Sequence, residues 1–377
     1  MKSLTSGTRS AIEAALVMAI GMGVGRFAYT ALYPHMVEEG VLSLSGGSLA
    51  ASANYAGYLI GALLAIKARP SNSYRFCLWA IAGTVACLAV LAFLHATWAI
   101  VAVRGIAGAF SAISMVAASL WLLEHRKHLH GAPLLYAGVG AGIALSAELV
   151  VLAAHLGLNS HELWLMLGIS SLALAGLAVP GLKSSGEADL VQVPTTSRGD
   201  DTVRSVPLVM IYGLAGFGYI ITATYLPLLV KTALPDMDSA HVWAVFGLGA
   251  APSCFLWHRI CLRLGTRKSL ALNLGVQALG VVLPIILPNG TGYLSSALLV
   301  GSSFMGTVTI AMPTAQRMAR HARGNLLATM TVIYSLGQIA GPLVASSLYS
   351  VGHGFSGSLW AAGAALLVGA CMSLVAL

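Results

Sequence analysis

Residues 21–34 read GMGVGRFAYTALYP and lie inside a long apolar segment that nevertheless carries an arginine, Arg26. An arginine at the depth of a membrane is costly unless another group pairs with it or water reaches it. The whole chain has 58% hydrophobic and 8% charged residues, a balance that soluble globular proteins of 377 residues do not show. The stretch therefore predicts an integral membrane protein in which Arg26 has either a function or a fixed partner.

The apolar segments along the chain are each about 20 to 25 residues long, which is enough for a helix to cross about 30 Å of hydrocarbon. None of them shows the strict alternation of a membrane β-barrel strand. We therefore predict an all-α polytopic membrane protein with twelve transmembrane helices in two six-helix halves. The predicted helices cover residues 10–34, 45–68, 74–95, 98–122, 132–155, 161–182, 206–231, 241–262, 268–288, 291–315, 325–350 and 354–376.

An internal repeat supports this division into halves. An offset of 193 residues aligns Gly23 and Pro34, in the first predicted helix, with Gly216 and Pro227, in the seventh. A single match of this kind is weak, because glycine and proline are frequent in membrane helices. Here the match falls on the first helix of each half, so it indicates two related, parallel halves.

A polar interval, residues 183–205, separates the predicted halves 1–182 and 206–377 and is expected to be a flexible cytoplasmic linker. If the N-terminus is cytoplasmic, seventeen of the twenty Lys and Arg residues lie on the cytoplasmic side. The positive-inside rule then places both termini in the cytoplasm. The basic residues form short clusters between apolar segments, so the net charge of +8 does not indicate a partner that is a nucleic acid.

Several kinds of site are not indicated by the sequence. The five cysteines and eleven histidines lack metal-ligand spacing, so we predict free thiols, no metal and no cofactor. The first apolar run is too long for a signal peptide and lacks a small-x-small cleavage site, so we expect it to be retained. No Walker sequence and no nucleophile-base arrangement is present, which argues against an ATP-driven pump and against an enzyme.

Two motifs carry a resemblance to a known family. IVAVRGIAGAFSA (100–112) resembles the Arg-x-x-Gln-Gly signature in the fourth helix of the major facilitator superfamily, with Ala107 where glutamine is usual. RLGTRK (263–268) resembles the second copy of the superfamily's cytoplasmic loop motif, with Leu262 in place of the acid. Six plus six helices around a polar central loop fit the same superfamily over essentially the whole chain.

Within that superfamily, three stretches are similar to the YbfB/YjiJ-like bacterial transporters: GVGRFAYTALYPHM (23–36), NYAGYLIGALL (54–64) and VWAVFGLGAAPSCFLW (242–257). The resemblance implies a secondary transporter of the bacterial inner membrane that works by alternating access. It also implies a monomer, and a central cavity around which the first, fourth and fifth helices meet.

Three ionisable side chains, Arg26, Arg104 and Glu148, lie well inside predicted helices, and helix rise places all three at similar depth in the outer half of the membrane. Glu148 is expected to compensate one arginine, which leaves one positive charge for a guest. A guanidinium binds carboxylate or phosphate through two parallel hydrogen bonds, so we predict a small organic anion or amphipathic acid as substrate. Glu148 is also the candidate for proton coupling, because burial and a neighbouring arginine affect its protonation in opposite directions.

Further polar side chains are candidates for the substrate site, and interhelical hydrogen bonding is the competing explanation for most of them. Tyr29 lies three residues beyond Arg26, which predicts that both are on the same helical face. Tyr219 occupies the repeat position of Arg26, so the second half substitutes a phenol for the cation. The predicted substrate-binding residues are Arg26, Tyr29, Asn54, Tyr58, Arg104, Tyr219, Tyr334 and Gln338.

Three other interpretations remain open at this point. Arg104 and Glu148 could form a fixed bridge between two helices while Arg26 extends toward the lipid headgroups. The protein could instead be a multidrug exporter of apolar or cationic compounds, with structural arginines. It could also be a membrane receptor or scaffold that does not transport.

Overall fold

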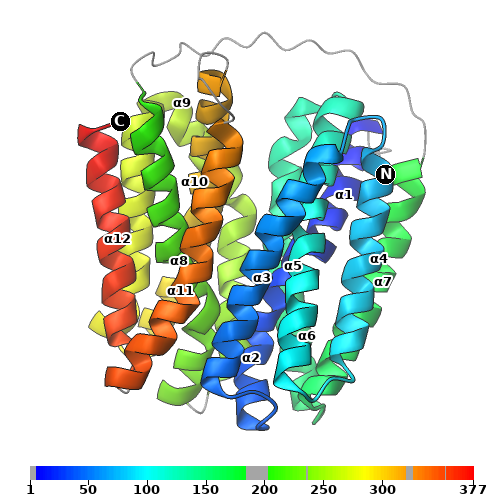
Figure 1. The fold of residues 1–377 in the computed structure, drawn as a ribbon, viewed down its shortest axis with the longest axis vertical. Helices are drawn as coiled ribbons and strands as arrows, with labels where there is room; N and C mark the ends of the chain where they lie inside the picture. Colours follow the sequence, from blue (N-terminus) through cyan, green and yellow to red (C-terminus); the bar gives the residue numbers. More distant parts are fainter. Residues whose placement is uncertain (1–5, 184–202, 235–236, 320–325, 353) are drawn as a thin grey trace. The chain divides into compact units, whose positions relative to one another are not determined.

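A computed structural model describes residues 6–183, 203–234, 237–319, 326–352 and 354–377 of the chain (Figure 1). The regular elements within these ranges are all helical, and eleven helices are long and apolar enough to cross a membrane. The chain divides into two compact units, Met1–Pro194 and Thr195–Leu377. The predicted linker, residues 183–205, lies mostly outside the described residues, so its boundaries stay a prediction.

Unit 1 begins with one long helical run that changes its type twice. The run starts as α1, becomes the π-helix η1 and ends as α2, and together these cover the first predicted span. α1 and η1 pack against α6, while α5 packs against α3 and α4. The elements of unit 1 are α1 (Ser6–Met18), η1 (Ala19–Phe27), α2 (Ala28–Glu38), α3 (Leu44–Leu64), η2 (Ala65–Lys67), α4 (Ser73–Leu91), α5 (Thr97–Ser119), η3 (Leu120–His125), η4 (Leu129–Gly131), α6 (Ala132–His155) and α7 (Ser160–Lys183).

Close packing around η1 depends on three glycines that face three different helices. A Cβ atom at Gly21 would overlap Ser114 of α5, and one at Gly25 would approach Thr84 of α4. A Cβ atom at Gly23 would lie 2.5 Å from the Cα atom of Gly142 in α6. Small residues let membrane helices approach this closely, so η1 is enclosed on three sides within unit 1.

The described residues of unit 2 form five helices. α8 packs against α11 and α12, and α9 packs against α10 and α12. Gly216 in α8 lies against the backbone of Tyr334 in α11, as Gly23 lies against Gly142 in unit 1. The elements are α8 (Ser205–Ala233), α9 (Ser239–Ile286), α10 (Gly290–Ala319), α11 (Leu326–Gly352) and α12 (Ser356–Val375).

α9 departs from the predicted count of twelve separate spans. It covers 48 residues and includes both predicted helices 241–262 and 268–288. Two helices join across a kink at Gly265, whose φ of 75° and ψ of 172° are not helical. Glycine adopts a positive φ without the steric cost that a Cβ atom brings. Helical structure therefore continues up to Gly265 on both sides, within the RLGTRK motif itself. Counted in this way, the described residues form eleven long apolar helices.

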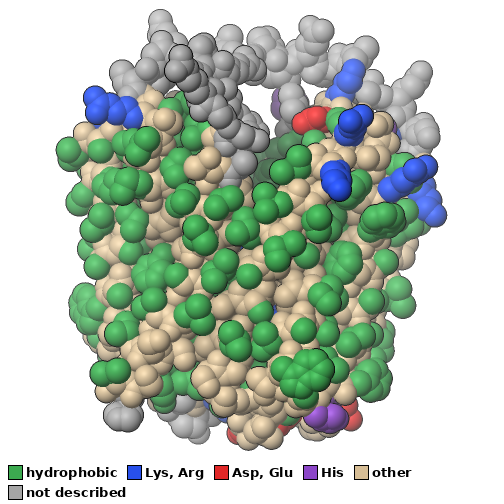
Figure 2. Space-filling model, viewed as in Figure 1, with side chains coloured by type: hydrophobic (Ala, Val, Ile, Leu, Met, Phe, Trp, Pro, Cys, Tyr) green, Lys and Arg blue, Asp and Glu red, His purple; other side chains and the backbone are tan. Residues whose placement is uncertain are grey.

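The surface of unit 1 suits a helix bundle in contact with lipid. Large apolar side chains are exposed on several of its helices, among them Trp79, Trp98, Leu152 and Leu177. In Figure 2 green apolar side chains cover the visible face of this unit along its length, whereas Lys and Arg gather near one end. An exposed surface of this kind is expected of helices that span a membrane.

Candidate functional site

The sequence-predicted substrate-binding residues lie in two side-chain clusters, one in each unit. The cluster in unit 1, here called the arginine cluster, contains all five residues predicted for that half. Arg26 comes from η1, Tyr29 from α2, Asn54 and Tyr58 from α3, and Arg104 from α5. Residues up to 78 positions apart in the chain therefore meet within one unit.

Arg104 is held by the backbone of the neighbouring π-helix. Its Nη1 atom donates to the carbonyl oxygen of Gly25 at 3.1 Å, and its Nη2 atom donates to that of Arg26 at 3.0 Å. The guanidinium carbon lies 4.4 Å from the ring centroid of Tyr29, and the side chain is 1% exposed. The planar guanidinium thus bridges two successive carbonyl groups near the junction of η1 and α2, and the partial negative charge of their oxygens favours the cation.

Arg26 has a different environment, although it lies beside Arg104. Its guanidinium carbon is 4.1 Å from the ring centroid of Tyr58 and 5.1 Å from those of Tyr55 and Phe27. The side chain is 3% exposed, so three rings surround a cation that is almost fully removed from solvent. Aromatic faces attract a cation through their quadrupole but carry no formal negative charge.

Asn54 connects α3 to the backbone of α5. Its Nδ2 atom donates to the carbonyl oxygen of Arg104 at 2.8 Å, and the side chain is completely buried. The helices approach closely here because Gly57 lies against the backbone of Gly105 and Gly108 lies against that of Asn54. Asn54 therefore fixes the helix that carries Arg104.

Tyr29 was expected to share a helix face with Arg26, but its ring lies under the guanidinium of Arg104. The expectation assumed an α-helix, whereas η1 is a π-helix that ends at Phe27, and a π-helix turns less per residue. The Tyr29 hydroxyl donates to the carbonyl oxygen of Gly47 at 2.8 Å. Its ring also stacks on Trp164 of α7, so Tyr29 links α2 to α3, α5 and α7.

Glu148 differs from the two buried arginines because its side chain is exposed. It is an exposed residue on α6, on the same face as Ala141, Leu145 and Leu152. Arg104 donates to carbonyl groups and not to Glu148, so within the described part of unit 1 the bridge weighed from the sequence is not formed. The physical reason is packing, because α6 lies mainly against α1 and η1 whereas α5 lies mainly against α3 and α4.

The cluster in unit 2, here called the aromatic cluster, contains Tyr212, Tyr219, Phe304, Tyr334 and Gln338. The Nε2 atom of Gln338 donates to the hydroxyl of Tyr219. The ring of Tyr334 stacks on Tyr212 at 4.4 Å and on Tyr219 at 6.0 Å between centroids, and Tyr219 stacks on Phe304 at 5.4 Å. The three residues predicted for this half, Tyr219, Tyr334 and Gln338, are thus brought together by α8 and α11.

Sequence reasoning missed two members of the aromatic cluster. Tyr212 lies seven residues before Tyr219, a spacing that places both on one face of an α-helix. That spacing was a usable signal. Phe304 offers no such signal, because a phenylalanine in an apolar helix is indistinguishable in sequence from an ordinary packing residue.

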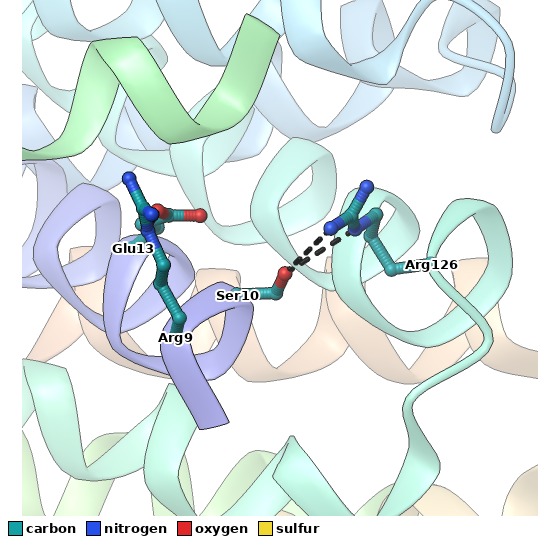
Figure 3. Close-up of polar contacts among 4 residues, drawn as sticks. All are labelled: Arg9, Ser10, Glu13 and Arg126. Carbon is teal, nitrogen blue, oxygen red and sulfur yellow. Dashed lines mark hydrogen bonds and ion pairs between the residues drawn. The ribbon is translucent and has the colours of Figure 1, made fainter. Parts of the chain in front are cut away.

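A buried carboxylate, Glu13, was also missed (Figure 3). Glu13 is 5% exposed, and its Oε1 atom accepts a hydrogen bond from Nε of Arg9 at 3.0 Å. Nearby, Nε and Nη2 of Arg126 donate to the Ser10 hydroxyl at 3.2 and 3.0 Å. The spacing of four residues between Arg9 and Glu13 is the usual helical ion-pair signal, but it lies at the edge of the first predicted span.

A comparison with known families identifies the class of protein to which this fold belongs. Residues 18–374 match the family described as the uncharacterised MFS-type transporter YbfB. The chain belongs to this family. No curated protein matches the chain. Family membership makes the chain a multi-pass membrane protein of the transporter class, and a secondary transporter rather than an enzyme.

Proposed function

We propose that this MFS-type protein moves a small organic anion or amphipathic acid by alternating access. The observation that carries the proposal is the pair of buried guanidinium groups in unit 1, where Arg104 donates to the backbone of Arg26 itself. Charged side chains inside a membrane are costly and mark substrate or ion pathways. A negatively charged cargo would offset this cost during part of the transport cycle.

The residues of the two clusters take different parts in this proposal. Arg26 is the guanidinium that binds the anion, and Tyr58 orients it by stacking. Arg104 and Asn54 hold the backbone around Arg26, and direct contact of Arg104 with the cargo stays a prediction. Tyr29 supports Arg104, and roles of Tyr219, Tyr334 and Gln338 in substrate binding stay predictions for unit 2.

The membrane arrangement belongs to the same proposal. We count α9 as two crossings that meet at the kink at Gly265, which would make twelve crossings in all. With this count, the positive-inside rule supports cytoplasmic positions for both termini. We assign the protein to the bacterial inner membrane as a monomer. Its partners are then the lipid bilayer, the anionic substrate and protons.

Thermal stabilisation of the purified protein by organic acids tests anion binding. An Arg26→Ala variant that still folds should lose the stabilisation, because the other guanidinium of the arginine cluster, that of Arg104, donates to the carbonyl oxygens of Gly25 and Arg26. Arg126→Ala is the matched control, since Arg126 donates to Ser10 outside the arginine cluster. Unchanged stabilisation of Arg26→Ala by acids would contradict the proposal.

Proton coupling is proposed to depend on Glu148, an intramembrane carboxylate whose neighbours on the exposed face of α6 are apolar. In liposomes, Glu148→Gln should abolish uptake driven by a pH gradient while exchange of substrate across the membrane continues. Glu162→Gln is the control, because this exposed carboxylate binds the backbone of Asn159 at the start of α7. Persistent accumulation driven by pH in Glu148→Gln would remove Glu148 from the coupling step.

A second candidate function, efflux of apolar or cationic compounds, is favoured by one observation. The aromatic cluster of unit 2 stacks three tyrosines and a phenylalanine, and aromatic faces bind apolar and cationic guests. Stabilisation by drug-like cations, together with no response to organic acids, would select this function. The reverse result selects transport of anions.

A further inference from the structure

We propose that unit 2 contains a buried site for ordered water at the side-chain amide of Gln277, between α9 and α10. This part of the molecule lies outside the arginine cluster and the aromatic cluster, so the site is independent of the proposed function. Gln277 belongs to a row of buried polar side chains along the contact of the two helices, and its own amide has no partner among the described residues.

The row, here called the polar seam, runs along the contact between α10 and the second half of α9. The Nδ2 atom of Asn273 donates to the carbonyl oxygen of Ser303 at 2.9 Å, and its Oδ1 atom accepts from the Thr307 hydroxyl at 2.6 Å. Spacings of three, four and seven residues keep the members of each helix on one face. The polar seam consists of Thr266, Ser269, Asn273 and Gln277 of α9 and of Ser296, Ser303, Thr307 and Thr314 of α10, each at most 4% exposed.

The pairing of the two helices determines what Gln277 faces. On one side of it, Asn273 contacts Ser303. On the other side, a Cβ atom at Gly280 would lie 2.9 Å from the side chain of Val300, so the helices touch there as well. Gln277 lies between these two contacts and on the same helix face as Asn273. It therefore faces the turn of α10 that ends at Ser303.

The amide of Gln277 has both a donor and an acceptor to satisfy. Within the described residues, neither its Oε1 atom nor its Nε2 atom has a hydrogen-bond partner, and the side chain is completely buried. The hydroxyl groups of Ser269 and Ser296 also have no partner there, whereas both amide atoms of Asn273 do. Burying an amide without hydrogen bonds is costly, and most buried polar atoms bond either protein or ordered water.

Water matches this site in chemistry and in size. A water molecule donates and accepts, as the amide of Gln277 requires. The Ser303 hydroxyl donates to the carbonyl oxygen of Leu299 at 2.6 Å and keeps lone pairs that can accept a further bond. Two amide atoms and one hydroxyl oxygen supply about the three partners that an internal water usually has. A larger ligand does not fit beside the close contact at Gly280, and the neutral side chains of the polar seam do not attract an ion.

The water site lies directly behind the aromatic cluster. Ser303 faces the polar seam, and the next residue, Phe304, stacks on Tyr219 with 5.4 Å between ring centroids. Water bound at Gln277 thus connects α9 to the turn of α10 that positions Phe304.

NMR of the purified full-length protein in lipid bilayers tests the proposal, with isotope labels in the side-chain amides of asparagine and glutamine. Magnetisation that starts on water should reach the Gln277 amide at least about threefold more strongly than that of Gln338, because a bound water lies within hydrogen-bond distance. Gln338 is the buried control, since its Nε2 atom donates to the Tyr219 hydroxyl. Asn289 is the positive control, because its side chain is exposed.

Two variants identify the Gln277 signal among the four glutamines of the chain. Gln277→Leu should remove the signal, and Gln277→Asn should move it to the asparagine region while keeping the transfer from water. The second variant retains an amide, so it serves if the first does not fold.

Transfer to Gln277 well above that to Gln338, followed to the new signal in Gln277→Asn, supports the water site. Transfer to Asn289 with no more at Gln277 than at Gln338 would show that the Gln277 amide is dry and would overturn the proposal. Neither result bears on anion binding by the arginine cluster.

Discussion

The arginine cluster of unit 1 and the aromatic cluster of unit 2 are built on repeat-related helices but differ in charge. Arg26 and Tyr219 occupy equivalent positions in the first helix of each half. Arg26 lies beside a second cation, Arg104, whereas Tyr219 accepts a hydrogen bond from the neutral amide of Gln338. One cluster is therefore cationic and the other is neutral, a difference that fits the proposed cargo with one charged end.

The backbone differs between the clusters as well. Residues 19–27 form the π-helix η1, whereas α8 stays an α-helix from Ser205 to Ala233. Long π-helical segments are rare, and π-type turns are frequent at functional sites. Arg104 donates to carbonyl groups at the end of this π-helix, and the bond between Gln338 and Tyr219 joins side chains only. The two clusters therefore differ in backbone conformation as well as in their side chains.

Each unit contains a glycine that packs closely against a neighbouring helix of the same unit. Replacing either glycine should give the largest effect on stability. Gly23→Ala and Gly216→Ala should each destabilise the protein by about 2 to 3 kcal/mol or prevent folding, because the added Cβ atom would meet backbone atoms of Gly142 or Tyr334. Gly176→Ala is the control, since a Cβ atom there meets nothing within 4 Å. Thermal melting and size-exclusion profiles measure the effect, and a loss confined to Gly23→Ala would show that the two units do not pack alike.

Arg104→Lys should give the next largest effect. One ammonium group cannot take the place of the planar fork that bridges the carbonyl groups of Gly25 and Arg26, so about 1 to 3 kcal/mol of stability should be lost. Binding of organic acids should weaken along with it, because Arg104 fixes the backbone of Arg26. The melting temperature and the acid titration measure both effects, with Arg126→Lys as control. Weakened acid binding at full thermal stability would instead indicate that Arg104 contacts the cargo directly.

Tyr219→Phe should have the smallest effect and tests the neutral side of the comparison. It removes the oxygen that accepts the hydrogen bond from Gln338, which should cost about 1 kcal/mol while the stacking on Phe304 remains. Stabilisation by organic acids should persist in this variant, as judged from the shift in melting temperature. If Tyr219→Phe loses the response to acids as fully as Arg26→Ala does, the division into a charged and a neutral site is wrong.

The helix positions were largely predictable because hydropathy is a local property of about 20 consecutive residues. The predicted span 132–155 coincides with α6, and 161–182 lies within Ser160–Lys183. The predicted polar members of both clusters do come together within each unit, since polar side chains are rare within apolar helices and so attract attention; Tyr212 and Phe304 were missed. The joining of two spans in α9 was not predicted, because the conformation of Gly265 decides whether the motif there forms a loop or a kink.

The sequence by itself determined that the chain crosses a membrane repeatedly and that Arg26 and Arg104 are buried cations, and it predicts that the two halves are related. Composition and spacing suffice for these conclusions, because apolar length and repeated glycine and proline positions are written along the chain. Only the tertiary structure decided which groups those cations meet. It placed Arg104 on backbone carbonyls, Arg26 among rings and Glu148 on an exposed face. The physical reason is that the groups which a buried side chain contacts depend on helix packing and on the π-helical turn of η1. Neither can be read from the local pattern of residues.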